Sequence, residues 1–171
     1  MPAVDGQTES AVLVPIYLAD AEPHVVLTRR RADLRRHAGE VSFPGGRRDP
    51  ADATLAATAL REAHEEIGLD PGAVSIAGQL RPTSTFVTNY AIHPFVGAIE
   101  AQTAWSVSAV EVDAVIELSL RALRLARGTA QITRRGFTFE TDAYELEGHM
   151  IWGATARILD ELIARLSPML D

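Results

Sequence analysis

The sequence of 171 residues contains no cysteine. This absence excludes disulfide bonds, thiolate nucleophiles and zinc or iron–sulfur centres held by cysteine. Long hydrophobic runs are also missing, since no apolar stretch approaches the ~20 residues that a membrane-spanning helix needs. The first ten residues lack the basic and apolar segments of a signal peptide, so we expect a cytoplasmic protein.

Positive charge is scarce relative to negative charge. Sixteen basic residues stand against 23 acidic ones, which gives a formal net charge of −7. Such a balance disfavours nonspecific binding to nucleic acid or to an anionic membrane, and we expect neither as a partner. The length suits a single domain over residues 1–171, with residues 1–10 flexible, and leaves a homodimer possible.

The pattern of hydrophobic residues predicts an α/β or α+β sandwich, in which strands are combined with two long helices. Strands are expected at residues 11–18, 24–28, 74–80, 92–99 and 110–117, around Val41, and in a hairpin over residues 131–141. Pro44 and the pair Gly45-Gly46 are expected to end one strand and open a loop. Helices are expected over residues 52–67, 119–126 and 151–166; Asp49 and Asp52 would cap the first, and Gly68 would end it.

Three glutamates crowd one face of the first expected helix. Glu62, Glu65 and Glu66 stand at i, i+3 and i+4, and each like-charged pair costs about 0.2–0.5 kcal/mol on an isolated helix. A cation would reverse that cost, and oxygen ligands suit a hard ion such as Mg²⁺ or Mn²⁺. The alternative is a solvated acidic face on which Arg61 pairs with Glu65. The glycine-bearing segment before the helix favours a site, because its backbone can approach a metal or a phosphate closely.

These residues resemble the Nudix box, in which a glycine and an acidic residue precede the run Arg-Glu-apolar-x-Glu-Glu-x-Gly-apolar. The matching residues are Gly46, Asp52, Arg61, Glu62, Ala63, Glu65, Glu66, Gly68 and Leu69. One residue more separates Asp52 from Arg61 than in the usual box, so strict spacing would select Ala53. The resemblance implies an α/β/α sandwich with a mixed central sheet and an enzyme that hydrolyses a pyrophosphate bond.

The sequence is also similar to one branch of that family, the coenzyme A pyrophosphatases. Its box-region residues are Phe43-Pro44-Gly45-Gly46, Asp49 and Asp52, followed by the run Thr58-Ala59-Leu60-Arg61-Glu62-Ala63. The upstream signature of the branch is matched by Leu27, Thr28, Arg30, Arg35 and Gly39, whereas Arg31 stands where the branch has Ser or Ala. The resemblance extends from about residue 11 to residue 166, and the segment 148–157 is similar to the final helix of the branch.

The resemblance implies roles for these residues. Glu65, Glu66 and the Gly46 carbonyl would bind the metal, and Glu62 would be either a ligand or the base that takes a proton from water. Arg61 would orient the glutamates by charge-assisted hydrogen bonds. Glu111 is the candidate for an assisting carboxylate from beyond the box.

The implied substrate is coenzyme A, cleaved to 3′,5′-ADP and 4′-phosphopantetheine. Arg30 and Arg35 would hold its phosphates, since the planar guanidinium suits bidentate contact, and Gly45 and Gly46 would let the backbone approach it. Two alternatives remain at this stage. The enzyme could act on another nucleoside diphosphate derivative, such as ADP-ribose, NADH or a dinucleotide, or the chain could be a Nudix module that binds nucleotides without turnover.

Overall fold

The computed structural model describes residues 7–34, 39–85 and 89–171. Its strands are β1 (Thr8–Ala19), β2 (Glu22–Arg30), β3 (Val41–Ser42), β4 (Gly45–Arg47), β5 (Ser75–Gln79), β6 (Thr83–Ser84), β7 (Tyr90–Ala98), β8 (Val112–Ser119), β9 (Arg127–Arg134), β10 (Phe137–Leu146) and β11 (His149–Trp152). Its helices are α1 (Leu55–Ile67), α2 (Leu120–Ala126) and α3 (Gly153–Leu166), with short 3-10 turns at Pro71–Ala73 and Ser167–Met169.

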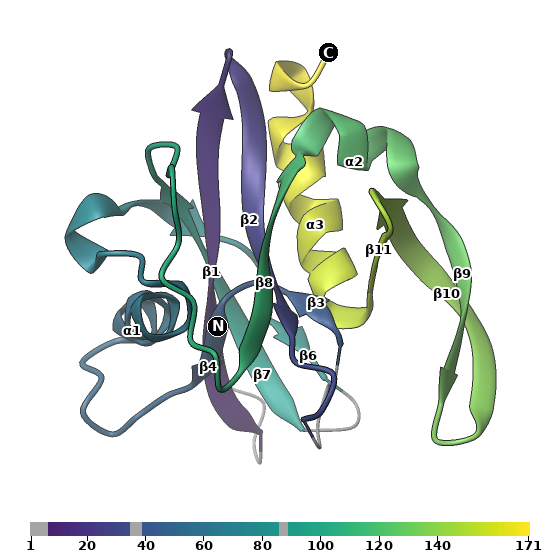
Figure 1. The fold of residues 1–171 in the computed structure, drawn as a ribbon, viewed down its shortest axis with the longest axis horizontal. Coiled ribbons are helices and arrows are strands. Elements are labelled where there is room, and N and C mark those ends of the chain that lie inside the picture. Colours follow the sequence, from purple (N-terminus) through teal and green to yellow (C-terminus); the bar gives the residue numbers. More distant parts are fainter. Residues whose placement is uncertain (1–6, 35–38, 86–88) are drawn as a thin grey trace.

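The main sheet is mixed, as the sequence predicts. Its central order is β3-β2-β1-β7-β5, and β4, β6 and β8 pair with β1, β7 and β2 respectively. The β1–β7 pairing is parallel and brings Ser10 opposite Ile92, whereas the other pairings in this sheet are antiparallel. Strand β1 therefore lies at the centre of the sheet (Figure 1).

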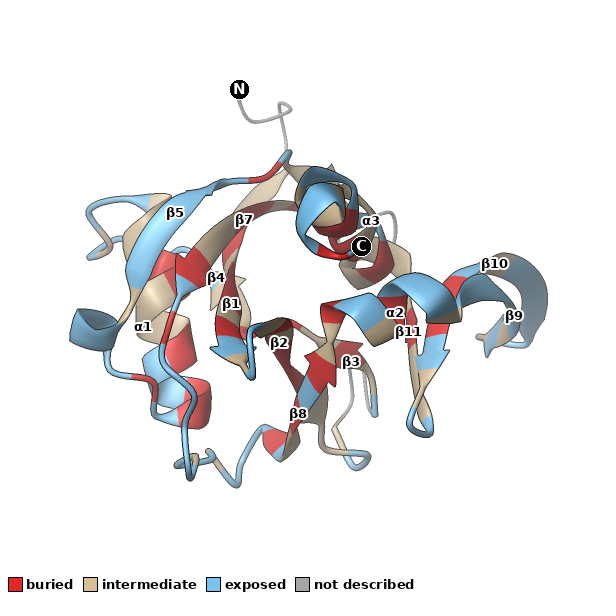
Figure 2. Ribbon diagram, turned by 90° about the horizontal axis from the view of Figure 1, so that it is seen from above, coloured by how far each residue is buried: buried red, intermediate tan, exposed pale blue. Residues whose placement is uncertain are grey.

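The helices cover the two faces of this sheet. Side chains on a strand point alternately to opposite faces. On β1, Leu13 belongs to the hydrophobic cluster beneath α1, while Val14 belongs to the cluster beneath α2 and α3. Figure 2 shows the buried residues lying between the sheet and these helices. The α/β/α sandwich with a mixed central sheet is thus confirmed.

A tight hairpin joins β1 to β2. The two loop residues, Asp20 and Ala21, have φ angles of 52° and 63°, and Ala19 pairs with Glu22 directly beside them. Two positive φ angles in a two-residue loop are typical of a type I′ turn, whose twist matches that of the strands. The turn joins the two strands that the sequence predicts at residues 11–18 and 24–28.

A second, three-stranded sheet has the order β11-β10-β9 and extends away from the sandwich (Figure 1). The predicted hairpin turns at Arg135 and Gly136, but its strands are longer than expected. The last helix begins at Gly153, so Ile151 and Trp152 are strand residues rather than the start of that helix.

The structure corrects three further expectations. Residues 8–10 are part of β1 and Ser10 is buried, so they do not belong to a flexible start. Gly45 and Gly46 lie in β4, not in a loop. The first helix begins at Leu55 with Thr54 as its cap, and neither Asp49 nor Asp52 takes that role. No helix in the described ranges is long and apolar enough to cross a membrane.

Candidate active site

Helix α1 presents the three glutamates at very different depths. Thr54 accepts a hydrogen bond from the Ala57 amide at the start of the helix, and Gly68, at φ 72°, ends it with an N–H···O bond to His64. Only glycine adopts such a conformation without strain, so the helix ends immediately after the glutamates. Ala59, Ala63 and Ile67 lie on the side of α1 that packs on the sheet and are fully buried.

The glutamates differ because the sheet covers only one side of this cluster. Glu66 is 6% exposed, the Glu62 side chain is 16% exposed and the Glu65 side chain is 57% exposed. The carboxylates therefore form a gradient from the interior to the surface of the molecule.

Strand β4 approaches its neighbours so closely that a side chain at either of its glycines would collide with them. The Gly45 amide donates a hydrogen bond of 3.1 Å to Glu66 Oε2. A Cβ on Gly46 would lie 2.6 Å from the Glu62 carboxyl carbon, and one on Gly45 would lie 2.3 Å from the Ala11 carbonyl oxygen. The two glycines thus bring β4 against both β1 and the carboxylates of α1.

Arg61 connects most of the remaining polar groups. Its Nε and Nη2 donate to the two oxygens of Asp52 at 2.9 and 3.0 Å. Its Nη1 donates to Glu62 at 3.1 Å and to Glu65 at 3.2 Å, and Nη2 also reaches the Arg47 carbonyl at 3.2 Å. Arg61 therefore fixes the glutamates relative to β4, which is the orienting contact expected of it.

Asp52 occupies the acidic position despite its unusual spacing. Besides the bidentate contact with Arg61, it accepts hydrogen bonds from the Thr58 hydroxyl at 2.8 Å and from the Asp49 amide at 2.9 Å. The hydrogen bonds from Arg61 hold the pKa of Asp52 well below its usual range. The extra residue is accommodated in the turn before α1, where the Asp52 amide bonds to the Asp49 carbonyl.

Burial and neighbouring negative charge disfavour the ionised forms of Glu62 and Glu66. Burial, followed by the nearby charge of Glu62, raises the pKa of Glu66 to about 8. Burial also raises the pKa of Glu62, although the charge of Arg61 opposes that shift. Carboxylates whose ionised form is disfavoured are strong binding partners for a cation, because the cation removes the repulsion between them.

Glu111 lies close enough to this cluster for its charge to raise the pKa of both Glu62 and Glu66. It is exposed, and its backbone carbonyl accepts a hydrogen bond from the Arg31 amide at 3.0 Å. The charge of Glu111 thus acts on the same carboxylates, and its assisting role stays a prediction.

The charge of Arg30 also acts on the cluster, since it favours the ionised form of Glu66. Its Nε atom is buried and has no hydrogen-bond partner in the part of the chain that the structure describes. A buried donor without a partner is uncommon, and this N–H can donate to a phosphate oxygen. Arg35, the second predicted phosphate-binding arginine, lies outside the described residues.

The donor set fits a hard divalent cation. Glu62 and Glu66 supply carboxylate oxygens, and Gly46 holds the backbone against Glu62 where a side chain would clash. Within the described ranges, however, no group of three or more acidic or histidine side chains is already arranged as a metal site. Glu65, the other predicted side-chain ligand, is engaged with Arg61, and its side chain would have to turn to reach a metal ion.

Two parts of the site were not foreseen. Thr58 binds Asp52 and is fully buried, and the Gly45 amide binds Glu66. Thr58 stands four residues after Thr54 on a helical pattern, and nothing in that spacing indicates a contact with Asp52. The Gly45 contact depends on β4, which is too short to show a strand pattern.

The α/β/α sandwich places a helix rich in carboxylates against a glycine-bearing strand, and this arrangement is the one expected of the Nudix family. The model of the NUDIX domain matches residues 8–135, and the chain belongs to this family. It is 41% identical over 163 residues to a protein of Salmonella paratyphi B named as an uncharacterized Nudix hydrolase, NudL; the match covers 94% of this chain and 84% of the relative. The protein is therefore a Nudix pyrophosphohydrolase, a class that uses divalent metal ions and acts on nucleoside diphosphate derivatives.

Solved structures agree with this fold. The NUDIX domain of Shewanella oneidensis NrtR, solved with ADP ribose, is 14% identical with a TM-score of 0.61, and the match covers 95% of this chain and 90% of that one. A MutT protein from Methanosarcina mazei Go1 is 18% identical with a TM-score of 0.62, and the match covers 96% and 99% of the two chains. At these identities the likeness concerns the fold alone.

Proposed function

We propose that this enzyme hydrolyses coenzyme A or a coenzyme A derivative to 3′,5′-ADP and 4′-phosphopantetheine, with Mg²⁺ or Mn²⁺. The observation that carries the proposal concerns Glu66, where residues of the box and of the upstream signature act on one carboxylate. The Gly45 amide donates a hydrogen bond to Glu66, and the charge of Arg30, from the upstream signature, lowers the pKa of the same carboxylate. These two contacts link residues of the resemblance to the carboxylate cluster and support the proposal.

Glu62, Glu65, Glu66 and the Gly46 carbonyl would hold the metal in this proposal. When bound, Mg²⁺ or Mn²⁺ would neutralise phosphate oxygens and lower the pKa of water. Arg61 orients Glu62 and Glu65, and Asp52 in turn fixes Arg61. Glu62 or Glu111 takes the proton from the attacking water, because both carboxylates border the cluster.

The phosphate contacts of this chain depend on arginine. All sixteen basic residues are arginine, and the chain has no lysine. Arginine's planar fork suits bidentate contact with phosphate oxygens, and the buried Nε of Arg30 lacks a partner among the described residues. Arg30 and Arg35 would thus bind the phosphates of the ADP half, and the 3′-phosphate of coenzyme A offers one more anion than ADP-ribose does.

A substrate panel tests the proposal. Coenzyme A, dephospho-coenzyme A, ADP-ribose, NADH and diadenosine polyphosphates are each incubated with the enzyme and Mg²⁺ or Mn²⁺, and the products are separated by chromatography. We expect 3′,5′-ADP from coenzyme A, formed with the highest kcat/KM in the panel. Preferred cleavage of ADP-ribose, NADH or a dinucleotide would show that coenzyme A is not the main substrate. Nucleotide binding without any cleavage would support a binding module without turnover.

Substitution of the glutamates tests the metal ligands. Glu65→Gln and Glu66→Gln should each lower kcat by about 100-fold or more, because a fixed charge at the reacting phosphates is lost. Glu117→Gln, on the exposed side of β8, is the control and should retain normal kcat. Near-normal turnover of either variant at limiting Mg²⁺ would show that the altered residue is not a ligand.

A further inference from the structure

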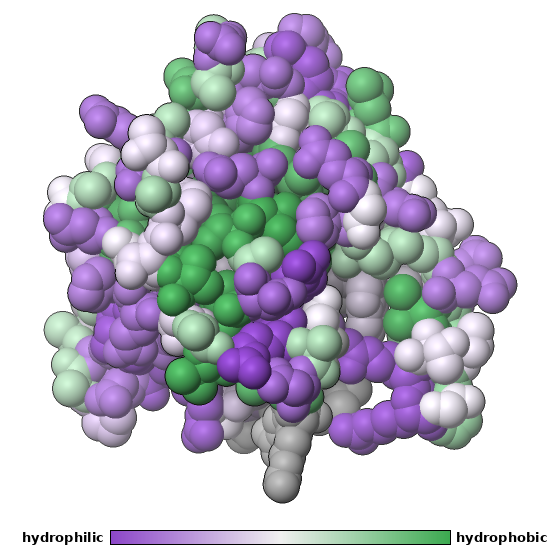
Figure 3. Space-filling model, in the orientation of Figure 1, coloured by the Kyte–Doolittle hydropathy of each residue, from purple (hydrophilic) through white to green (hydrophobic). Residues whose placement is uncertain are grey.

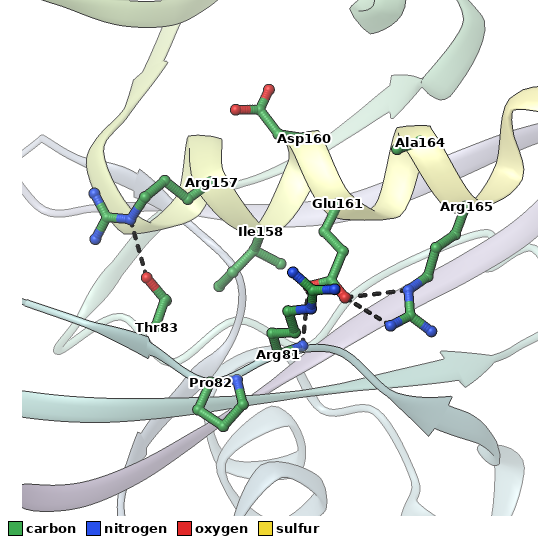
Figure 4. Close-up of a pocket in the computed structure, with 9 residues that line it drawn as sticks. All are labelled: Arg81, Pro82, Thr83, Arg157, Ile158, Asp160, Glu161, Ala164 and Arg165. Atoms are coloured by element: carbon green, nitrogen blue, oxygen red, sulfur yellow. Dashed lines mark hydrogen bonds and ion pairs between the residues drawn. The ribbon is translucent and has the colours of Figure 1, made fainter. Parts of the chain in front are cut away.

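A second cavity lies on the other side of the sheet from α1. It has a volume of about 670 Å³ and lies between α3 and the segment that leads into β6 (Figure 4). Its lining residues are Arg81, Pro82, Thr83, Arg157, Ile158, Asp160, Glu161, Ala164 and Arg165. Since α3 and α1 cover opposite faces of the sheet, this cavity is separate from the carboxylate cluster.

The cavity carries an excess of positive charge. Glu161 pairs with Arg165 at 2.8 Å and thereby compensates only one of the three arginines. Asp160 binds Arg127 and Tyr144, and Figure 4 shows it pointing away from the arginines. A solvated i, i+4 ion pair accounts for Glu161 and Arg165. It does not account for Arg81 and Arg157, which have no acidic partner in the described part of the chain.

Arg157 is held in place by neutral groups. Its Nε donates to the Thr83 hydroxyl at 2.9 Å and its Nη2 donates to the Ser84 carbonyl at 2.7 Å. These contacts fix the guanidinium without neutralising it. Because arginine has five N–H donors, three remain for a ligand.

Arg81 is the second arginine of the cavity that has no acidic partner among the described residues. Its backbone amide donates to Glu161 at 2.9 Å, which anchors the residue at the edge of the cavity, while its guanidinium makes no hydrogen bond or ion pair with the described residues. Loss of this side chain would therefore remove charge from the cavity without breaking a contact within the protein.

The volume and the apolar lining of the cavity indicate which kind of anion it would bind. Pro82, Ile158 and Ala164 supply apolar surface between the arginines. Small-molecule sites typically have volumes of about 300–1,000 Å³ and combine apolar walls with a few fixed polar groups. A free phosphate ion would occupy only part of such a space, whereas a nucleotide would place its phosphate on the arginines and its base or sugar on the apolar wall.

We infer that this cavity is a second binding site, for the phosphate monoester of a nucleotide-sized molecule, with Arg81 and Arg157 as its phosphate-binding residues. The inference does not depend on which substrate the carboxylate cluster hydrolyses.

Chemical-shift titration of the isotopically labelled full chain, in buffer without metal, tests the site. The probes are 3′,5′-ADP, 5′-AMP, inorganic phosphate and adenosine. We expect saturable shifts in the amides of residues 81–84 and of α3, with 3′,5′-ADP and 5′-AMP binding more tightly than phosphate and adenosine failing to bind. Shifts confined to α1 and β4, no saturable shifts, or equal binding of adenosine would overturn the inference.

Two substitutions with opposite expected effects on the affinity for 5′-AMP extend the test. Arg81→Ala should weaken binding of 5′-AMP by about 5–10-fold, since one charge-assisted hydrogen bond is lost. Glu161→Gln should strengthen it by about 2–5-fold, because an opposing charge is removed. Arg124→Ala removes an arginine that pairs with Asp171 outside the cavity, and binding should stay unchanged. Binding of 5′-AMP that is equal in Arg81→Ala and Arg124→Ala would overturn the assignment of Arg81.

Discussion

Glu66 combines deep burial with very little compensation. Within the described residues it receives one backbone hydrogen bond, from Gly45, and the charge of Glu62 raises its pKa further. Ionising a buried carboxylate in such surroundings is costly unless a cation or further donors are present. Without metal, the proton is the group that relieves this cost.

Glu66→Gln should therefore change how the stability of the metal-free protein depends on pH. The pKa of Glu66, about 8, lies above its ordinary value of 4.5, so its contribution to stability is full below pH 4.5 and is lost as pH rises to 8. Relative to wild type, the variant should gain on the order of 3 kcal/mol more at pH 8 than at pH 5. Urea unfolding with a chelator present measures this difference, and Glu65→Gln, at an exposed position, should show no such gain.

Asp52→Asn tests the unusual acidic position. The amide cannot accept both guanidinium bonds, so Arg61 should lose its fixed orientation, with a loss of about 1–3 kcal/mol in the free energy of unfolding. We also expect kcat to fall by about 10-fold or more while KM changes little, because Arg61 orients the glutamates. Asp49→Asn is the matched control, since its contact with Ala51 lies outside the Arg61 network. Equal kcat in the two variants would show that Asp52 has no part in catalysis.

The sequence predicts these residues better than it predicts their contacts. Glu62, Glu65 and Glu66 follow from helical spacing, and the structure places Arg61 beside two of them. The predicted caps at Asp49 and Asp52 were wrong, because Arg61 and Thr58 use the Asp52 carboxylate and leave capping to Thr54. Aspartate suits a cap and a salt bridge equally well, so spacing alone does not separate the two roles.

At the scale of elements, β4 depends on two glycines for different reasons. An added Cβ at Gly45 meets backbone, the Ala11 carbonyl oxygen at 2.3 Å, whereas one at Gly46 meets the end of the flexible Glu62 side chain. Backbone cannot yield as a side chain can, so the two positions should respond to the same substitution in different ways.

Gly45→Ala should destabilise the fold by about 1–3 kcal/mol, since β4 must move away from β1. Gly46→Ala should retain most of its stability and lose about 10-fold or more in kcat, because Glu62 is displaced. Thermal unfolding and steady-state kinetics measure the two effects, with Gly128→Ala in open space as the control. The reverse pattern, with Gly46→Ala unstable and Gly45→Ala inactive but stable, would contradict this account of β4.

The sequence misassigns β4 because Pro-Gly-Gly is typical of a loop. Three residues are too few to show alternation, and the pairing partner of β4 lies far upstream in β1. Longer elements were easier to predict: α1, α2 and the strands β1, β2, β7 and β8 all lie within a few residues of their expected positions. Their hydrophobic periodicity spans enough residues to define the period.

At the scale of the whole molecule, the order of the strands was beyond prediction from this sequence. Hydrophobic alternation identifies β1 and β7 as strands, but it does not say that they pair, or that they are parallel. The resemblance to the Nudix family supplied the mixed sheet. In Figure 3, hydrophobic surface is visible over the central strands and hydrophilic residues surround it, and hydrophobic periodicity alone does not predict this arrangement.

Hydrogen exchange should separate the sandwich from the second sheet. Amides of β1 and β7, which lie between helices on both faces, should exchange most slowly. Those of β9 and the outer half of β10 should exchange fastest, since β9 is an edge strand and Phe137 beside it is 77% exposed. Exchange followed by mass spectrometry measures this order. Equal protection of β9 and β1 would show that a second molecule, such as a copy of this chain, covers the sheet.

The parallel pairing of β1 with β7 has a consequence for synthesis on the ribosome. Strands β1 to β4 and α1 leave the exit tunnel before β7, and one edge of β1 stays open until the chain has been extended beyond Ala98. An open strand edge is a template for pairing with other chains. The carboxylate helix is thus made early in translation on a sheet whose central seam closes late, and this interval is when the nascent protein is most exposed to aggregation and in greatest need of chaperones.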